Sequence, residues 1–180
     1  MREARMHQIT ITRLSAERFA TDAPGLAELL ADAVDSGASL GFLAPYAPQA
    51  AAGWWRELSA AVADGSHLVW AAYDGDRVVG TVSLVPGRKD NGRHRAELVK
   101  LMVHRAARGR GVARRLMAAA EQEARSRRVD LLLLDTETGS DAEFLYHATG
   151  WTAYGVVPDY AADPGGTLRD CTFFYKQLVG

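Results

Sequence analysis

Two apolar runs joined by a short polar turn restrict the fold of this chain more than any other feature. In the stretch HLVWAAYDGDRVVGTVSLVP, the two runs flank Asp74, Gly75 and Asp76. Acidic residues around a glycine are typical of the tight turn of a β-hairpin. The stretch therefore predicts antiparallel strands over residues 67–73 and 77–86, and the other elements must fit the sheet that these strands begin.

The segments before and after this hairpin alternate between strand and helix patterns. Strand patterns occupy residues 7–14, 93–104, 129–137, 151–157 and 169–178. Helical spacing of apolar residues occupies residues 23–37, 49–65, 111–127 and 141–150. Asp22 and Pro24 are expected to open the first helix, since both residue types favour a helix start. The order predicts a mixed α+β fold, and the chain length fits a single domain over residues 1–180.

Composition narrows the classes of protein and partner. The net charge is −1, so no overall basic charge favours nucleic acid as a partner. No apolar run approaches the roughly 20 residues that span a bilayer, which predicts no membrane partner. The single cysteine, Cys171, excludes an internal disulfide, fits a cytoplasmic location and is expected in the core of a strand. The histidines show no metal-like spacing, so no metal is expected.

The stretch ARGRGVARRLM alternates arginine and glycine just before a predicted helix. A helix start has unpaired backbone N–H groups and the positive end of the helix dipole, and glycines let the backbone approach an anion. The stretch is therefore either a phosphate cradle or a plain turn. It differs from the Walker loop because no Lys-Ser or Lys-Thr follows Gly111, and from G-x-G-x-x-G because Arg114 replaces the third glycine.

The longer run ELVKLMVHRAARGRGVARRLM resembles the central signature of the GNAT acetyltransferase superfamily. Arg108, Gly111 and Ala113 stand at its fixed positions, and the predicted order of elements is similar along nearly the whole chain. The resemblance implies the GNAT acyltransferase fold, a central, mostly antiparallel twisted sheet of about seven strands flanked by helices.

The resemblance also implies acetyl-CoA as the cofactor. Its pyrophosphate would be held by the backbone N–H groups of Arg108, Gly109, Arg110, Gly111, Val112 and Ala113, and its pantetheine amides by the backbone of Met102 and Val103. Arg105, Arg110, Arg114 and Arg115 either screen the phosphates or are ordinary surface charges. Many GNAT proteins carry an asparagine early in the following helix, where this chain has Asp141, Ala142 and Glu143, so that cofactor contact is missing or replaced.

A closer resemblance extends over most of residues 37–176. The segments RAELVKLMV, LLLLDTETGS, AEFLYHATGW and GVVPDYAADPGGTL, with GASLGFL upstream, are similar to the tabtoxin-resistance acetyltransferases, which acetylate the amine of an amino-acid β-lactam toxin. This implies that Glu97 and Asp135 bind the substrate and remove a proton, and that Tyr146 is the acid for the departing thiolate. From the residues alone, Glu97 is equally a solvent-facing strand residue, Asp135 a turn residue and Tyr146 a core aromatic.

The loop SGASLGFLAPYAP combines glycine with apolar and aromatic residues, which favours a pocket wall over a solvent-facing connector. Candidate acceptor contacts are Phe42, Tyr46, Trp54, Trp55 and, from a late loop, Asp159. Only one of the two adjacent tryptophans can face the core fully, because neighbouring helix positions point in different directions.

These features predict an acetyl-CoA-dependent N-acetyltransferase whose partner is a small-molecule amine, including an amino-acid-like β-lactam toxin or antibiotic. The alternatives are a housekeeping acetyltransferase for amino acids, polyamines or protein amino termini, and a non-catalytic acetyl-CoA-binding sensor. GNAT proteins often pair through sheet edges or late strands, and by this analogy the C-terminal segment CTFFYKQL is expected to allow a homodimer.

Overall fold

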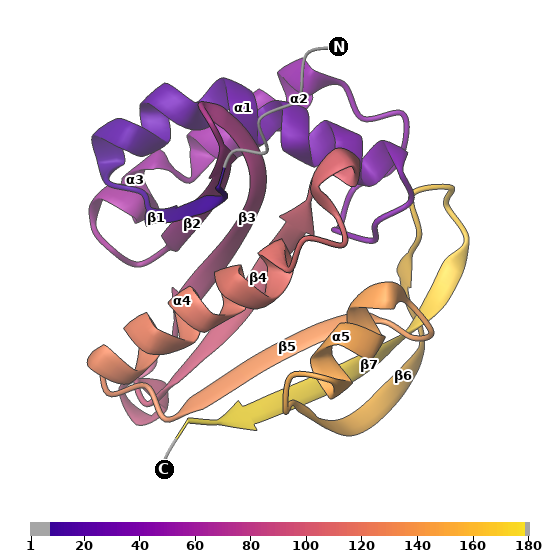
Figure 1. Cartoon of the computed structure of the whole chain (residues 1–180). Helices are drawn as coiled ribbons and strands as arrows, with labels where there is room; N and C mark the ends of the chain where they lie inside the picture. The colour runs from indigo at the N-terminus through magenta and orange to yellow at the C-terminus, as the bar shows by residue number, and fades with distance from the viewer. Residues whose placement is uncertain (1–7, 179–180) are drawn as a thin grey trace.

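The computed structural model describes residues 8–178, which follow the expected mixed α+β order (Figure 1). Across the sheet the strand order is β1-β2-β3-β4-β5-β7-β6, and all neighbouring pairs are antiparallel except β4 and β5. The prediction of a mostly antiparallel sheet of about seven strands is confirmed. The strands are β1 (Thr10–Arg13), β2 (Leu68–Asp74), β3 (Arg77–Pro86), β4 (Arg95–Val103), β5 (Leu131–Glu137), β6 (Thr152–Ala162) and β7 (Leu168–Gln177).

Helices cover both faces of the sheet and define two hydrophobic cores. They are α1 (Ala16–Asp35), α2 (Pro48–Glu57), α3 (Ser59–Ala63), α4 (Val112–Ser126) and α5 (Asp141–His147). Trp70 of β2 packs in the core beneath α4 and α5, whereas the next residue, Ala71, packs in the core beneath α1, α2 and α3. Successive strand residues point to opposite faces, so the central strands are apolar on both sides.

The parallel contact between β4 and β5 is very short. It joins three residue pairs, which run from Arg95 with Leu131 to Glu97 with Leu133. Beyond these pairs β4 continues to Val103 and β5 to Glu137, and the two strands run apart towards their C-terminal ends (Figure 1). The sheet therefore divides, beyond Glu97, into a half ending at β4 and a half beginning at β5.

The first helix starts earlier than predicted. Helix α1 begins at Ala16, and the Ser15 hydroxyl caps it by accepting a hydrogen bond from the Arg18 N–H at 3.1 Å. Pro24 lies inside α1, so the prediction that it opens the helix is wrong. An interior proline removes one backbone hydrogen bond. Phe19 before it and Leu26 after it are both buried, and this burial keeps the helix continuous across Pro24.

Several other boundaries also differ from the predicted ones. The helix predicted over residues 49–65 divides at Leu58 into α2 and α3. Strand β6 continues to Ala162, through a register shift after Val157, rather than ending at residue 157. The first strand is shorter than residues 7–14, and its predicted first residue lies outside the described part of the chain. Within residues 8–178, no helix has the length and apolar character needed to cross a membrane.

Candidate active site

The predicted cradle lies directly before α4. Gly109 and Gly111 have φ of 74° and 73°, in the left-handed region that favours glycine. A Cβ at either position would meet no atom within 4 Å, so the space beside the backbone is open. No described side chain caps α4, although it is 15 residues long. An uncapped helix start lined by glycine fits an anion such as a pyrophosphate.

Arg108 connects the cradle to two other elements. Its guanidinium donates to the Val103 carbonyl of β4 at 3.2 Å and to the Ser36 hydroxyl at the end of α1 at 3.1 Å. One of the two β4 residues expected to pair with a bound pantetheine therefore already has its carbonyl oxygen in contact with Arg108. Val112 is buried, and it can reach the cradle only with its backbone.

The further arginines around the cradle also contact protein groups. Arg105 pairs with Asp32 at 2.6 Å and Arg110 pairs with Asp74 of the hairpin, whereas Arg114 donates to the Ala148 carbonyl at 3.4 Å and Arg115 to the Ile9 carbonyl at 2.9 Å. These contacts make the backbone, rather than a free cluster of cationic side chains, the main anion-binding feature of the cradle.

Strand β4 contains a bulge close to the point where it leaves β5. Thr81 of β3 pairs with Met102, whereas Ser83 pairs with Val99, so β4 holds one extra residue between these pairs. Lys100 lies in this bulge and has φ of 55°, a conformation that costs energy for any residue other than glycine. Bulges occur frequently next to active sites, where they redirect a side chain.

The two predicted carboxylates lie on neighbouring strands and on the same face of the sheet. Glu97 pairs with Leu133, two residues before Asp135. Alternation turns Glu97 and Asp135 away from α4 and α5, because the residues around them are packed in the core on that side; these are Ala96, Leu98, Leu132 and Leu134. Both carboxylates are exposed, at the point where β4 and β5 part.

Asp135 has a perturbed proton affinity. Although solvent reaches the residue, burial of its carboxyl raises the pKa, and the Lys100 ammonium opposes this rise. Burial lowers the pKa of Lys100, and the Asp135 carboxylate opposes that change in turn. A carboxylate that binds a proton more tightly than an ordinary aspartate is a stronger base at neutral pH.

Tyr146 lies in the core between the sheet and α5, with 6% of its surface exposed. Its ring centroid is 5.8 Å from those of Trp151 and Phe174. Burial raises the pKa of its hydroxyl well above the ordinary value, and the Asp135 charge raises it further. Tyr146 is thus a core aromatic residue on the α5 side of the sheet, the side from which Glu97 and Asp135 are turned away, and its hydroxyl keeps its proton at neutral pH.

The aromatic loop, defined as residues 36–47, contributes two rings to a cluster of aromatic side chains. The Phe42 ring centroid lies 4.6 Å from that of Tyr46 and 5.4 Å from that of Trp54 on α2. All three side chains are partly exposed. The Lys100 ammonium lies 5.2 Å from the centre of the Phe42 ring and 5.4 Å from that of Trp54, so the cluster lies next to the β4 bulge.

Trp55, also expected at the acceptor site, lies in the core instead. Its side chain is fully buried, and the indole N–H donates to the Leu26 carbonyl of α1 at 3.1 Å. Its ring packs edge-on against Trp54 at 4.8 Å and therefore supports that residue from behind. One of the two adjacent tryptophans faces the core fully, as predicted, and Trp54 remains partly exposed.

Asp159 lies in the irregular part of β6 rather than in a loop. It has φ of 50°, is exposed, and its N–H donates to the Asp170 carboxylate of β7 at 3.0 Å. The aromatic loop does reach this hairpin, because the Ala44 N–H donates to the Pro164 carbonyl in the β6–β7 turn at 2.8 Å. Among the contacts of residues 8–178, none joins Asp159 itself to the rings of the loop.

Lys100 is the residue that sequence reasoning missed. The segment RAELVKLMV reads as an amphipathic strand in which a lysine is unremarkable. Its left-handed backbone follows from the pairing of β4 with β3. Its contacts come from distant segments: Leu40, 60 residues away, and Phe42 in the aromatic loop, and Trp54 on α2. The one feature of the sequence that points to Lys100 is its charge among the apolar residues of the second half of this strand.

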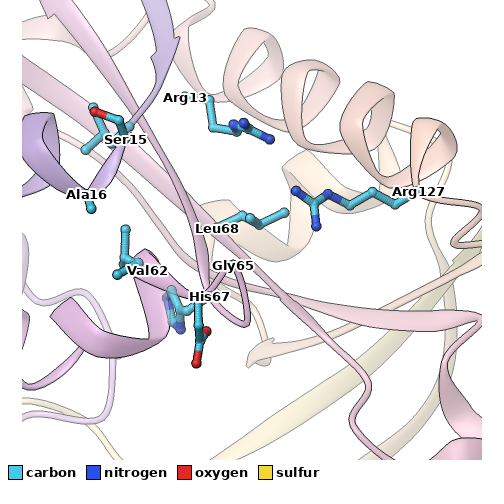
Figure 2. Close-up of a pocket in the computed structure, with 11 residues that line it drawn as sticks. Arg13, Ser15, Ala16, Val62, Gly65, His67, Leu68 and Arg127 are labelled. Carbon is cyan, nitrogen blue, oxygen red and sulfur yellow. The ribbon is translucent and has the colours of Figure 1, made fainter.

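A cavity of about 330 Å³ lies elsewhere, at the junction of β1 and α1 (Figure 2). None of the predicted site residues lines it. Figure 2 shows Arg13 and Arg127 pointing towards each other beside it, and both donate to one oxygen of Glu123, at 2.5 and 2.8 Å. Because this carboxylate compensates the two cations, the cavity is not an evident anion site.

Nucleophilic chemistry at the single cysteine finds little support. Cys171 is buried in β7, as expected, and burial raises the pKa of its thiol to about 11, which keeps it protonated and unreactive. Among residues 8–178, no group of three or more His, Cys, Asp or Glu side chains is placed to hold a metal ion.

Comparisons with known proteins identify related sequences and folds. A model described as the Acetyltransferase (GNAT) family matches residues 30–151. The crystal structure of a ribosomal-protein-alanine N-acetyltransferase from Brucella melitensis is 27% identical, with a TM-score of 0.73 over 93% of this chain and 99% of that one. The structure of yncA, a putative acetyltransferase from Salmonella typhimurium with its cofactor acetyl-CoA, is 22% identical, with a TM-score of 0.75 over 95% and 94%. A putative phosphinothricin N-acetyltransferase is 17% identical, with a TM-score of 0.76 over 96% and 100%.

Proposed function

The chain belongs to the acetyltransferase (GNAT) family and is an acyltransferase that uses acetyl-CoA, and from this premise we propose that its acceptor is the amine of a small molecule. The finer proposal is an amino-acid-like acceptor, such as a β-lactam toxin or antibiotic that acetylation would inactivate. Its support is the similarity of residues 37–176 to the tabtoxin-resistance acetyltransferases. We further propose that residues 1–180 form one catalytic domain located in the cytoplasm, which the single, unpaired Cys171 supports.

The chain has a suitable place for each part of the cofactor. When bound, acetyl-CoA supplies an acetyl group activated as a thioester. The backbone of residues 108–113 would hold the pyrophosphate, which the open space beside Gly109 and Gly111 supports. The backbone of Met102 and Val103 would hold the pantetheine, since β4 is unpaired with β5 beyond Glu97. Val103 would then exchange its contact with Arg108 for one with the cofactor.

Three side chains are proposed to act on the acceptor amine and on the departing thiolate. An ammonium cannot attack a carbonyl carbon, so a base must first remove one of its protons. Asp135 accepts this proton at its carboxylate, and Glu97 on the neighbouring strand orients the amine. Tyr146 holds a proton at its hydroxyl for the departing thiolate. Phe42, Tyr46, Trp54 and Asp159 are proposed to bound the acceptor, while Trp55 stabilises Trp54.

The observation that carries this proposal is the raised pKa of Asp135 at the point where β4 and β5 part. Perturbed carboxylates gather at catalytic sites because burial tunes them towards the working pH. The first experiment measures thiol release from acetyl-CoA across a panel of amines: amino-acid β-lactams, free amino acids, polyamines, aminoglycosides and short peptides. Release with amino-acid-like amines supports the finer proposal.

The Asp135→Asn variant tests the proposed base. Loss of a general base lowers kcat by about 10²–10⁴-fold, while acetyl-CoA affinity should stay close to that of the unchanged protein. Asp130→Asn, just before the same strand and exposed, is the matched control and should leave kcat unchanged. An equal loss of turnover and cofactor affinity in Asp135→Asn would assign Asp135 a structural role instead.

A second acceptor class is the amino terminus of a protein. The observation that favours it is the 27% identity, across 93% of this chain, to a structure described as a ribosomal-protein-alanine N-acetyltransferase. Thiol release with alanine-initiated peptides but with no free amino acid would support this class. Acetyl-CoA binding with no release for any amine would instead favour the sensor.

The segment CTFFYKQL, expected to allow pairing, lies mostly in β7, which has β5 on one side and β6 on the other and so has no free edge. We propose instead that two copies pair through β6. This strand is the outer edge of the sheet, and its exposed apolar side chains include Tyr154, Val156, Val157 and Tyr160. A long apolar edge strand invites pairing with another chain, and pairing with an identical strand is self-complementary.

A further inference from the structure

Lys100 occupies a costly position that glycine would fill more cheaply. Its φ of 55° lies in the left-handed region, where a non-glycine residue is strained. Its side chain is also partly buried, and burial lowers the pKa of the ammonium. A lysine kept under both penalties indicates that its side chain makes interactions that the fold or the function requires.

The first of these interactions holds the aromatic loop. The Lys100 ammonium donates to the Leu40 carbonyl at 2.7 Å, and it lies over the rings of Phe42 and Trp54 at 5.2 and 5.4 Å. A partly desolvated cation over aromatic faces is attracted to them, because the face of each ring carries partial negative charge. The opposite end of the loop is held by Ala44 at the Pro164 carbonyl, so Lys100 provides the anchor on the β4 side.

The second interaction is with Asp135. Lys100 lies in the bulge of β4 and Asp135 on β5, beyond the last residue pair that joins these strands. Their charges attract, and each favours the ionised form of the other. The other titratable groups that interact with this pair are His67 before β2, Tyr146 of α5 and Cys171 of β7. Burial keeps all three uncharged near pH 7, which leaves Lys100 as the cation that acts on Asp135.

We propose that Lys100 is a positioning residue that couples the aromatic loop to the Asp135 carboxylate. One ammonium group fixes the loop beside the bulge through the Leu40 carbonyl and the two rings, and the same charge favours the carboxylate form of Asp135. The loop and the base therefore belong to one electrostatic unit. This inference rests on the proposed function for the role of Asp135, but its contacts belong to the free protein.

The coupling is tested by two measurements that do not depend on enzyme activity. Chymotrypsin cleaves after aromatic residues and leucine, so digestion followed by mass spectrometry reports cuts after Phe42, Leu43 and Tyr46. Carbon NMR of protein labelled at aspartate carboxyls, with Asp135→Asn for assignment, gives the midpoint of Asp135. Lys100→Met should be cut in the loop at least severalfold faster than the unchanged protein. Its Asp135 midpoint should move to higher pH, because the opposing cation is gone while the burial remains.

Three further variants separate positioning from general stability. Lys100→Gly removes the side chain and relieves the backbone strain, so strain cannot account for its behaviour, and it should still show both changes. Lys100→Arg keeps the charge and should restore the Asp135 midpoint. Lys176→Met is the matched control: Lys176 also donates to a backbone carbonyl, that of Thr149 at 2.9 Å, and lies over a tryptophan, Trp151 at 6.0 Å. It should show neither change.

Acetyl transfer adds a third readout. In Lys100→Met, the acidic limb of the pH profile of kcat/KM should shift upward together with the Asp135 midpoint. No change in either measurement, a change in only one of them, or the same changes in Lys176→Met would each overturn the coupling. A protein that acetylates no amine would refute the proposed function, whereas the proteolysis and NMR results would still decide the role of Lys100.

Discussion

His67 shows what a single buried side chain contributes to the stability of this protein. Its Nε2 is buried with no hydrogen-bond partner among the described residues, and burial, followed by the charges of Lys100 and Arg88, lowers its pKa. An unfolded histidine binds a proton near pH 6.5, so below that pH the unfolded chain holds more protons than the folded one. Stability present above about pH 6.5 is therefore lost as the pH falls through the folded-state pKa.

The His67→Gln variant should remove this dependence. As the pH falls from about 6.5 to the folded-state pKa of His67, the free energy of unfolding should fall more steeply in the unchanged protein than in His67→Gln. The difference in slope is at most about 1.4 kcal/mol per pH unit. Urea unfolding at a series of pH values measures the difference. Parallel curves for the two proteins would show that His67 does not carry this linkage.

Among the elements, the start of α4 carries a prediction about cofactor binding. Gly111→Leu forces a side chain into a left-handed position and into the open space of the cradle. Gly65 is a matched control, because its φ of 76° is similar, its surroundings are equally open, and it lines the cavity of Figure 2 instead. Each leucine variant should lose about 1–2 kcal/mol of stability. Only Gly111→Leu should also weaken acetyl-CoA binding, by about tenfold or more, in a calorimetric titration. Equal affinities for the two variants would contradict the cradle.

The elements that sequence predicts well are those whose signals are local. Asp74-Gly75-Asp76 specifies a turn through its own backbone preferences, and the glycines before α4 mark a helix start in the same way. The prediction that Pro24 opens the first helix is wrong because the continuity of α1 depends on burial against strands that are distant in sequence. At the site, the residue types on β4 and β5 were foreseen. The bulge at Lys100 was not, because it exists only through the pairing of β4 with β3.

At the scale of the whole molecule, the exposed edge of β6 leads to a prediction of oligomeric state. Sedimentation of the unchanged protein should give twice the chain mass of 19.5 kDa. Val156→Lys places a charge on this edge and should give the mass of one chain. Phe144→Lys, at an exposed apolar residue of α5, is the control and should stay a dimer. A monomeric unchanged protein would refute pairing through β6.

The three residue pairs between β4 and β5 are the only strand pairing in residues 8–178 that joins the two halves of the sheet. From Glu97 to Val103 the strand extends about 20 Å beyond this short seam, at about 3.3 Å per residue. Asp135 lies two residues beyond the seam on β5 and Lys100 three residues beyond it on β4, so the angle between the two strands sets how far apart these residues lie. Substitutions deep in either core, far from any reacting group, can thus alter turnover by changing the angle at which the two halves meet.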